Sequence, residues 1–312
     1  MYERSLLISR ELGDKPSIAM TLVNVGSLEK DIGELAAAEK HLQEGLVLSR
    51  ESGNMALLAG ALNNLGLLAL ENGNPAEATR MLEQSVAIAR RGSDKNQYAI
   101  ALEDLASVQL TIGKLAAASK LFTEAMQVLA ETHNEGAAAN ALWSIGDILF
   151  AQGDLEGARK MYEECLALRE RLGEQALAAA THMSLAQLAL EQNHAPEAEV
   201  AVRQGIERLR PQNDANAQSE AEALLARVLL AEGKTQEAEV AVARARSLVA
   251  RTASVRPSIV VTIADAQIRS AAGRPSDAIK ALQDAVKQAT EWPSTVGVGG
   301  PGCIGRGRSQ GG

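Results

Sequence analysis

The chain has 312 residues, of which 46% are hydrophobic and 2% aromatic, and its formal net charge of −8 is spread along its length. This acidic balance argues against a nucleic-acid-binding protein, which normally carries a basic face. No apolar run approaches the roughly 18 residues that a membrane-spanning helix needs, and the first residues lack the apolar core of a signal peptide, so we expect no membrane partner.

A period of forty residues runs through the chain and is visible in three columns. Residues suited to a tight turn recur at Gly33, Gly73, Gly113, Gly153, Asn193, Gly233 and Gly273. Five residues after each lies an alanine: Ala38, Ala78, Ala118, Ala158, Ala198, Ala238 and Ala278. Seven residues before each lies another small residue: Gly26, Gly66, Ala106, Gly146, Ala186, Ala226 and Ala266. A fixed period in this range indicates a stacked repeat protein.

Residues 55–94 show what one cycle contains. Leu58, Leu62 and Leu65 have the spacing of a helix, and Gly73 predicts its end because glycine tolerates left-handed dihedral angles. Asn74 and Pro75 then predict the start of a second helix, as an N-cap followed by proline in the first turn. Each cycle is therefore predicted to be a helix, a tight turn, a second helix and another turn.

The forty-residue period also predicts the organisation of the chain. Residues 1–14 align with the second helix of an incomplete cycle, which predicts an open apolar end and indicates either a fragment or a natural start further upstream. Residues 15–290 hold seven cycles. The glycine-rich residues 291–312 are predicted to be disordered, or alternatively to be sequence that does not belong to the domain. The approximate cycle boundaries are 15–54, 55–94, 95–134, 135–174, 175–214, 215–254 and 255–290.

These motifs resemble the tetratricopeptide repeat (TPR). Leu65-Gly66 and Ile145-Gly146 match the signature of its first helix, and Ala118…Phe122 and Ala158…Tyr162 match that of its second helix. The forty-residue variant is similar to the repeats of kinesin light chains and of bacterial regulatory proteins. The resemblance implies an all-α fold: an α-solenoid of antiparallel helix pairs (a TPR superhelix) with about seven repeats plus an N-terminal half repeat.

A polar column on the predicted first helices is the candidate binding site. It runs through Asn24, Asn64, Asp104, Ser144 and Ser184, and Asn63, Trp143 and Asp147 lie nearby by helical spacing. In similar TPR proteins the first helices line a concave groove, and asparagines of this column bond the backbone of an extended peptide. An amide can donate and accept at once, which suits it to reading a main chain. The alternative is an ordinary solvated helix face.

We expect no catalytic residues, no cofactor and no metal ion. The glycine-rich string 297–302 matches a nucleotide-binding pattern but lacks the strand and helix that such a site requires. The four histidines show no metal-ligand spacing. Cys165 and Cys303 form no paired motif, which favours a reducing, cytoplasmic setting.

Two functions are compatible with this sequence. The favoured one is a protein–protein interaction scaffold whose groove binds a peptide, a protein surface or another domain of the same longer chain, as the regulatory repeat region of a bacterial signalling or transcription-control protein. The alternative is an architectural module that self-associates through the open N-terminal end. An enzyme is the least favoured reading, because no convergent set of acids, bases or nucleophiles is present.

Overall fold

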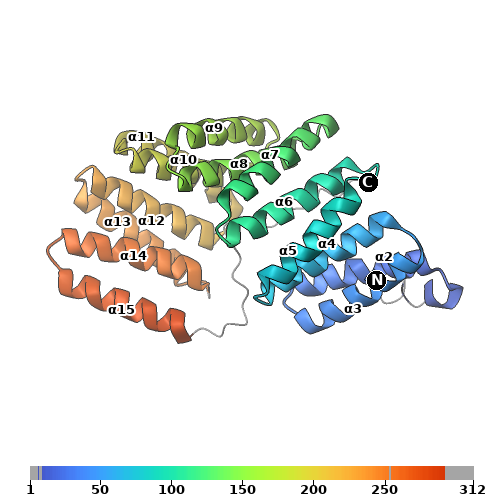
Figure 1. Ribbon diagram of the computed structural model, residues 1–312. Helices are drawn as coiled ribbons and strands as arrows, with labels where there is room; N and C mark the ends of the chain where they lie inside the picture. Colours follow the sequence, from blue (N-terminus) through green and yellow to red (C-terminus); the bar gives the residue numbers. More distant parts are fainter. Residues whose placement is uncertain (1–5, 7–8, 253, 292–312) are drawn as a thin grey trace. The chain divides into compact units, whose positions relative to one another are not determined.

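The computed structural model describes residue 6, residues 9–252 and residues 254–291 (Figure 1). Residues 292–312 of the predicted disordered tail, and residues 1–5 and 7–8 of the N-terminal stretch predicted to be half a repeat, lie outside the described residues. In the described part, all regular structure is helical. The helices of the first repeats are α2 (Lys15–Asp31), α3 (Leu35–Glu51), α4 (Met55–Glu71), α5 (Pro75–Ala89), α6 (Lys95–Thr111), α7 (Leu115–Thr132) and α8 (Glu135–Ala151). They are followed by α9 (Leu155–Arg171), α10 (Gln175–Glu191), α11 (Ala195–Leu209), the short 3-10 turn η1 (Arg210–Gln212), α12 (Ala215–Ala231), α13 (Thr235–Val249), α14 (Val255–Ala271) and α15 (Pro275–Glu291).

The forty-residue turn column separates the two helices of each pair. All seven of its members have positive φ angles, from 60° at Asn193 to 85° at Gly33. This is the left-handed conformation that ends a helix, and glycine or asparagine adopts it at the lowest cost. The predicted role of Asn193 as a substitute for glycine is confirmed.

Side-chain caps start many of the helices. Asn74 Oδ1 accepts a hydrogen bond from the backbone N–H of Glu77 at 3.2 Å, and Asp154 Oδ1 accepts one from Gly157 at 3.0 Å. Asp14, Asn54, Asp94, Asn134 and Asp214 cap the first helices of their pairs in the same way. Each cap satisfies a backbone donor that the first helical turn leaves unpaired.

The small-residue column lets the two helices of a pair approach closely. A Cβ atom added at Gly26 or Gly66 would lie 2.6 or 2.7 Å from Cγ of Leu42 or Leu82 on the following helix. The other members of the column include Ala106, Ala186, Ala226 and Ala266, and these alanines are all buried. The side chain that faces this column therefore fills the space between the two helices.

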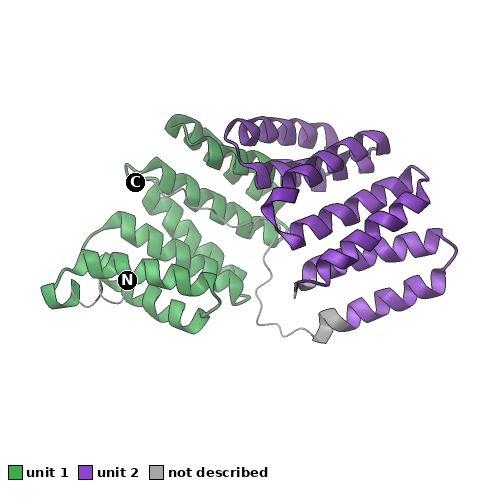
Figure 2. Ribbon diagram, turned by 180° about the vertical axis from the view of Figure 1, so that it is seen from behind, with its two compact units in different colours: residues 1–144, 295–312 green, residues 145–294 purple. Residues whose placement is uncertain are grey.

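The helices form two compact units (Figure 2). The first unit, residues 1–144, holds α2–α7 and the first part of α8, and the second unit, residues 145–294, holds the rest of α8 and α9–α15. In the first unit the first helices of successive pairs touch, α2 with α4 and α4 with α6, and in the second unit α10 touches α12 and α12 touches α14. In the first unit, α3 also packs on α4 and α5 on α6, and in the second unit α9 packs on α10, α11 on α12 and α13 on α14. The fold is an α-solenoid of TPR type, as predicted.

The cores are built mainly of alanine, leucine and valine, whose side chains interdigitate between successive pairs. In the described part of the chain, no helix combines the length and the apolar character required to cross a membrane.

Candidate functional site

The residues in and beside the polar column of the first unit do not share one hydrogen-bonding pattern. Asn63 Nδ2 donates a hydrogen bond to Asp104 Oδ2 at 2.7 Å, which links α4 to α6. Asn64 Nδ2 donates to the carbonyl oxygen of Gly60 in its own helix at 3.0 Å. Asn24 is half-buried and makes no side-chain hydrogen bond within the described residues. Asn63 and Asn64 therefore have different hydrogen-bond partners, and Asp104 is buried.

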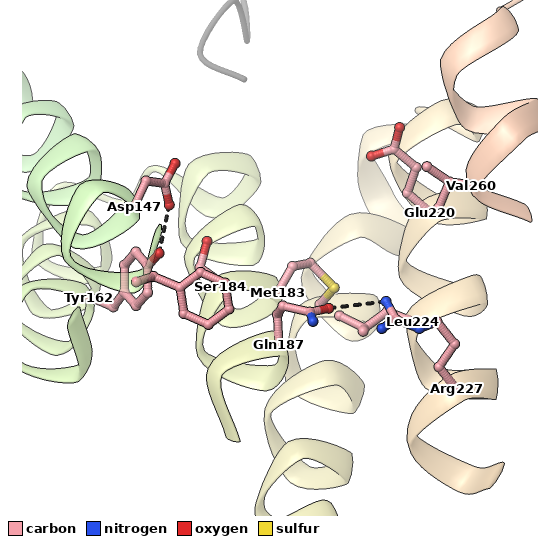
Figure 3. Close-up of a pocket in the computed structure, with 10 residues that line it drawn as sticks. Asp147, Tyr162, Met183, Ser184, Gln187, Glu220, Leu224, Arg227 and Val260 are labelled. Atoms are coloured by element: carbon pink, nitrogen blue, oxygen red, sulfur yellow. Dashed lines mark hydrogen bonds between the residues drawn. The ribbon is translucent and has the colours of Figure 1, made fainter. Parts of the chain in front are cut away.

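In the second unit, two of the predicted residues line a groove. Asp147 and Ser184 lie on its wall, and the groove has a volume of about 290 Å³ (Figure 3). First helices of four successive pairs contribute to it: α8, α10, α12 and α14. The complete lining is Asp147, Phe150, Tyr162, Met183, Ser184, Gln187, Glu220, Leu224, Arg227 and Val260. Trp143 and Ser144 are half-buried and belong to the first unit.

Asp147 is held by the second helix of its own pair. The Tyr162 hydroxyl of α9 donates a hydrogen bond to Asp147 Oδ1 at 2.6 Å, and the Tyr162 ring is almost fully buried. Burial raises the pKa of Asp147 to about 6, although the hydrogen bond from Tyr162 and the charge of Arg169 act in the opposite direction. Desolvation of the charged form is the cause of such a shift. Asp147 is thus a half-buried acid that titrates close to neutral pH.

The other charged groups of the groove lie on α12. Arg227 Nη1 donates a hydrogen bond to Gln187 Oε1 of α10 at 3.1 Å. Glu220 is half-buried, and burial raises its pKa against the opposing charge of Arg256, whose Nε lies 3.9 Å from Glu220 Oε1. The wall therefore carries two carboxyl groups and one guanidinium group.

The remaining lining residues are apolar: Phe150, Met183, Leu224 and Val260. A groove with apolar walls and a few polar groups has the composition of a ligand-binding site. The described residues contain no group of three or more His, Cys, Asp or Glu side chains placed to hold a metal ion.

Several groove residues were not predicted from the sequence. Tyr162 was assigned only to the aromatic position of the TPR signature, and nothing singled out Met183, Gln187, Glu220, Leu224, Arg227 or Val260. One signal was present: Asp147, Gln187 and Arg227 are forty residues apart and so occupy the same position in three successive repeats. Their chemistry differs, so the column does not stand out as the polar column of asparagine and serine does.

Comparison with protein families gives three matches. The MalT-like TPR region matches residues 99–296, a tetratricopeptide repeat model matches residues 57–131, and anaphase-promoting complex subunit 5 matches residues 8–69. Comparison with curated proteins gives no match.

Solved structures share the fold at low sequence identity. A signal transduction ATPase (STAND) protein with a TPR sensor from Pyrococcus horikoshii is 17% identical with a TM-score of 0.75, over 93% of this chain and 44% of that one. The chain thus corresponds to less than half of the STAND protein. The nearly identical, kinesin-light-chain-type TPR-like repeats of Podosopora anserina are 20% identical with a TM-score of 0.54, over 64% of this chain and 99% of that one.

A third structure has a bound peptide. The Rap conjugation gene regulator of plasmid pLS20, in complex with the Phr* peptide, is 14% identical with a TM-score of 0.61, over 94% of this chain and 80% of that one. At these identities the structures share the fold with this chain. The MalT-like TPR region, by contrast, matches this chain at the level of sequence over more than half of the 312 residues. The chain therefore belongs to the MalT-like tetratricopeptide-repeat family.

Proposed function

We propose that this chain is a non-enzymatic protein-interaction module whose second unit binds an extended segment of a partner protein or peptide. The observation that carries the proposal is the groove itself. Four successive first helices supply apolar walls, and Asp147, Ser184 and Arg227 supply polar groups that can orient a ligand. Extended peptides gain affinity from such apolar contacts and specificity from a few placed polar groups.

The related structures support this choice of ligand. The Rap regulator carries a peptide, and the STAND protein uses its TPR region as a sensor. By analogy, we propose that the chain acts as a regulatory repeat region, and that its ligand is either a separate partner or another domain of a longer signalling or transcription-control protein. We place the interaction in the cytoplasm, because the buried, unpaired thiol of Cys165 suits a reducing compartment.

A selection from a displayed library of random peptides tests this function. We expect peptides that bind the full chain, and we expect Ser184→Phe, which fills the groove, to weaken them by about tenfold or more. Val240→Phe is the matched control, because Val240 is exposed on α13 and does not line the groove. Fluorescence anisotropy measures the affinities.

Two results would overturn the proposal: a selection that enriches no binder, or binders that Ser184→Phe leaves unaffected. If Ser184→Phe lowers the melting temperature, methyl NMR of Met183 in the unchanged chain gives the same information. A peptide in the groove must shift the Met183 methyl signal, whereas a peptide bound elsewhere leaves it in place.

A second candidate function is self-association. The outer side of α15 exposes Ile279, Leu282 and Val286 next to one another, and exposed apolar patches of this kind favour interfaces. A copy of this chain seated there would give a size that rises with concentration in light scattering. Val286→Glu is expected to abolish that rise, and a monomer at all concentrations would exclude this function.

A further inference from the structure

A row of three polar side chains crosses the groove of the second unit. Asp147, Gln187 and Arg227 each follow directly after the small-residue column, on α8, α10 and α12. Figure 3 shows them in this order along the groove, with Gln187 between the two charged residues. The corresponding residues of the first unit are Ser27, Leu67 and Ser107. Opposite charges at the two ends of the row are therefore a property of the second unit.

Within the part of the chain that the structure describes, neither Asp147 nor Arg227 forms an ion pair. Asp147 makes no ion pair within the described residues; Tyr162 donates to its Oδ1, and its second carboxylate oxygen points away from Tyr162 (Figure 3). Arg227 bonds the neutral amide of Gln187 and likewise has no carboxylate partner in the described part of the chain.

Other half-buried arginines in the described residues are paired. Arg159 pairs with Glu197, Arg208 with Glu170, and Arg269 with Asp265. Arg227 differs from them although Asp147 and Glu220 line the same groove. The intervening helix α10 keeps the two ends of the row apart, so each of them is left open to a ligand.

A half-buried charge has lost part of its hydration without gaining a counter-ion, so an arriving opposite charge is bound more strongly than in bulk water. We infer that the groove takes a dipolar peptide segment, in which a basic side chain pairs with Asp147 and an acidic side chain pairs with Arg227. This inference rests on the proposed function and specifies the chemistry of its ligand.

The geometry also sets the spacing of the two ligand charges. Packed helix axes lie roughly 8–10 Å apart, so two steps from α8 to α12 span about 16–20 Å. The long side chain of Arg227 reaches back toward Asp147 and so shortens the distance between the two charged groups. Because an extended peptide advances about 3.3 Å per residue, this distance corresponds to about four residues between the two ligand charges. Met183 and Leu224 line the groove with apolar surface, so the intervening residues are expected to be apolar.

Capped synthetic peptides test the inference. One series places lysine before glutamate with about three to six apolar residues between them, and a second series reverses the order. Partner peptides replace the lysine, the glutamate or both by alanine. We expect the best spacing in one order to bind at least about tenfold more tightly than the uncharged peptide, and this gain is expected to fall as salt is added.

Charge reversal in the protein identifies the contacts. Arg227→Glu is expected to abolish the preference for glutamate and to create one for lysine at the same peptide position. Asp147→Asn is expected to remove only the preference for the lysine. Arg251→Glu, at an exposed position outside the groove, is the matched control and is expected to change neither preference. Arg227→Gln gives a second, milder variant for the same comparison.

The possible outcomes separate the two proposals. Peptides that bind in the groove with the same affinity whatever their charges would overturn the dipolar ligand and leave the interaction module standing. A preference that Arg227→Glu and Arg227→Gln leave unchanged would also overturn it. Absence of any groove-binding peptide, including those from the random library, would overturn the proposed function itself.

Discussion

Gly146 on α8 and Tyr162 on α9 are in such close contact that a single methyl group does not fit between them. A Cβ atom at position 146 would lie 2.6 Å from Tyr162 Cε1 and 2.7 Å from Cδ1. The ring cannot easily withdraw, because it is almost fully buried and its hydroxyl is bonded to Asp147. Tyr162, which lines the groove, can therefore occupy its position only because residue 146 is a glycine.

Gly146→Ala is expected to destabilise the chain by about 1–2 kcal/mol, because overpacking outweighs the better helix propensity of alanine. Gly60→Ala is the matched control. It lies on another first helix, where the added Cβ would meet only Gln97 Nε2 at 3.7 Å, and it is expected to stabilise by about 0.5–1 kcal/mol. Urea unfolding followed by circular dichroism measures both changes, and equal effects would contradict the packing argument.

Asp147 is expected to titrate with a midpoint of about 6 when its carboxyl carbon is followed by NMR. Tyr162→Phe removes a hydrogen bond that favours the charged carboxylate, so it is expected to raise this midpoint further. Since the folded pKa lies above the value of about 3.9 for a free aspartate, the folded chain holds the proton more tightly. The stabilisation from this group is complete below about pH 4 and is lost as the pH rises through about 6. A midpoint near that of a free aspartate would show that the carboxyl is fully hydrated.

Asn63→Ala is expected to cost about 1–2 kcal/mol, because the buried carboxylate of Asp104 loses a hydrogen-bond donor from the neighbouring pair. Asn64→Ala is the matched control on the same helix. The Asn64 amide donates to a backbone carbonyl of its own helix. Its replacement is therefore expected to change the free energy of unfolding by no more than about 0.5 kcal/mol. Thermal unfolding distinguishes the two, and a larger loss for Asn64→Ala would show that the neighbouring amide carries more of the packing.

Asn193→Gly is expected to leave stability unchanged or to raise it by about 0.5 kcal/mol, because glycine adopts positive φ at no steric cost. Asn193→Ala is expected to lower it by about 1 kcal/mol, since the φ angle of 60° at this turn is unfavourable for alanine. Differential scanning calorimetry of the two variants checks the order. A more stable alanine variant would show that this turn tolerates a different backbone.

The sequence was informative about the fold because its signals are repeated and local. The turn column, the N-cap Asn74 and the small-residue column each act within a few residues or within one helix pair, and all three occur in the structure as predicted. Even the exception at Asn193 was recognisable, because the forty-residue period determined its position in the turn column.

The candidate site was less predictable because it depends on single side chains from different repeats. Asn64 has the residue type of a peptide-binding column, yet it bonds the backbone of its own helix. Tyr162 fits the core position of the signature, and the signature says nothing about its hydroxyl, which reaches Asp147. Arg227 of α12 donates a hydrogen bond to Gln187 of α10, and no local pattern within one repeat predicts a bond between two repeats.

The neighbour-only packing of the helices has a consequence for how the chain reaches this structure. In the described part of each unit, helices pack mainly on elements one or two positions away along the chain. Little loop-closure entropy has to be overcome before such contacts form. Folding can therefore nucleate at any well-capped helix pair and spread in both directions along the chain. The groove forms only when the helix pairs that supply its four first helices have packed together.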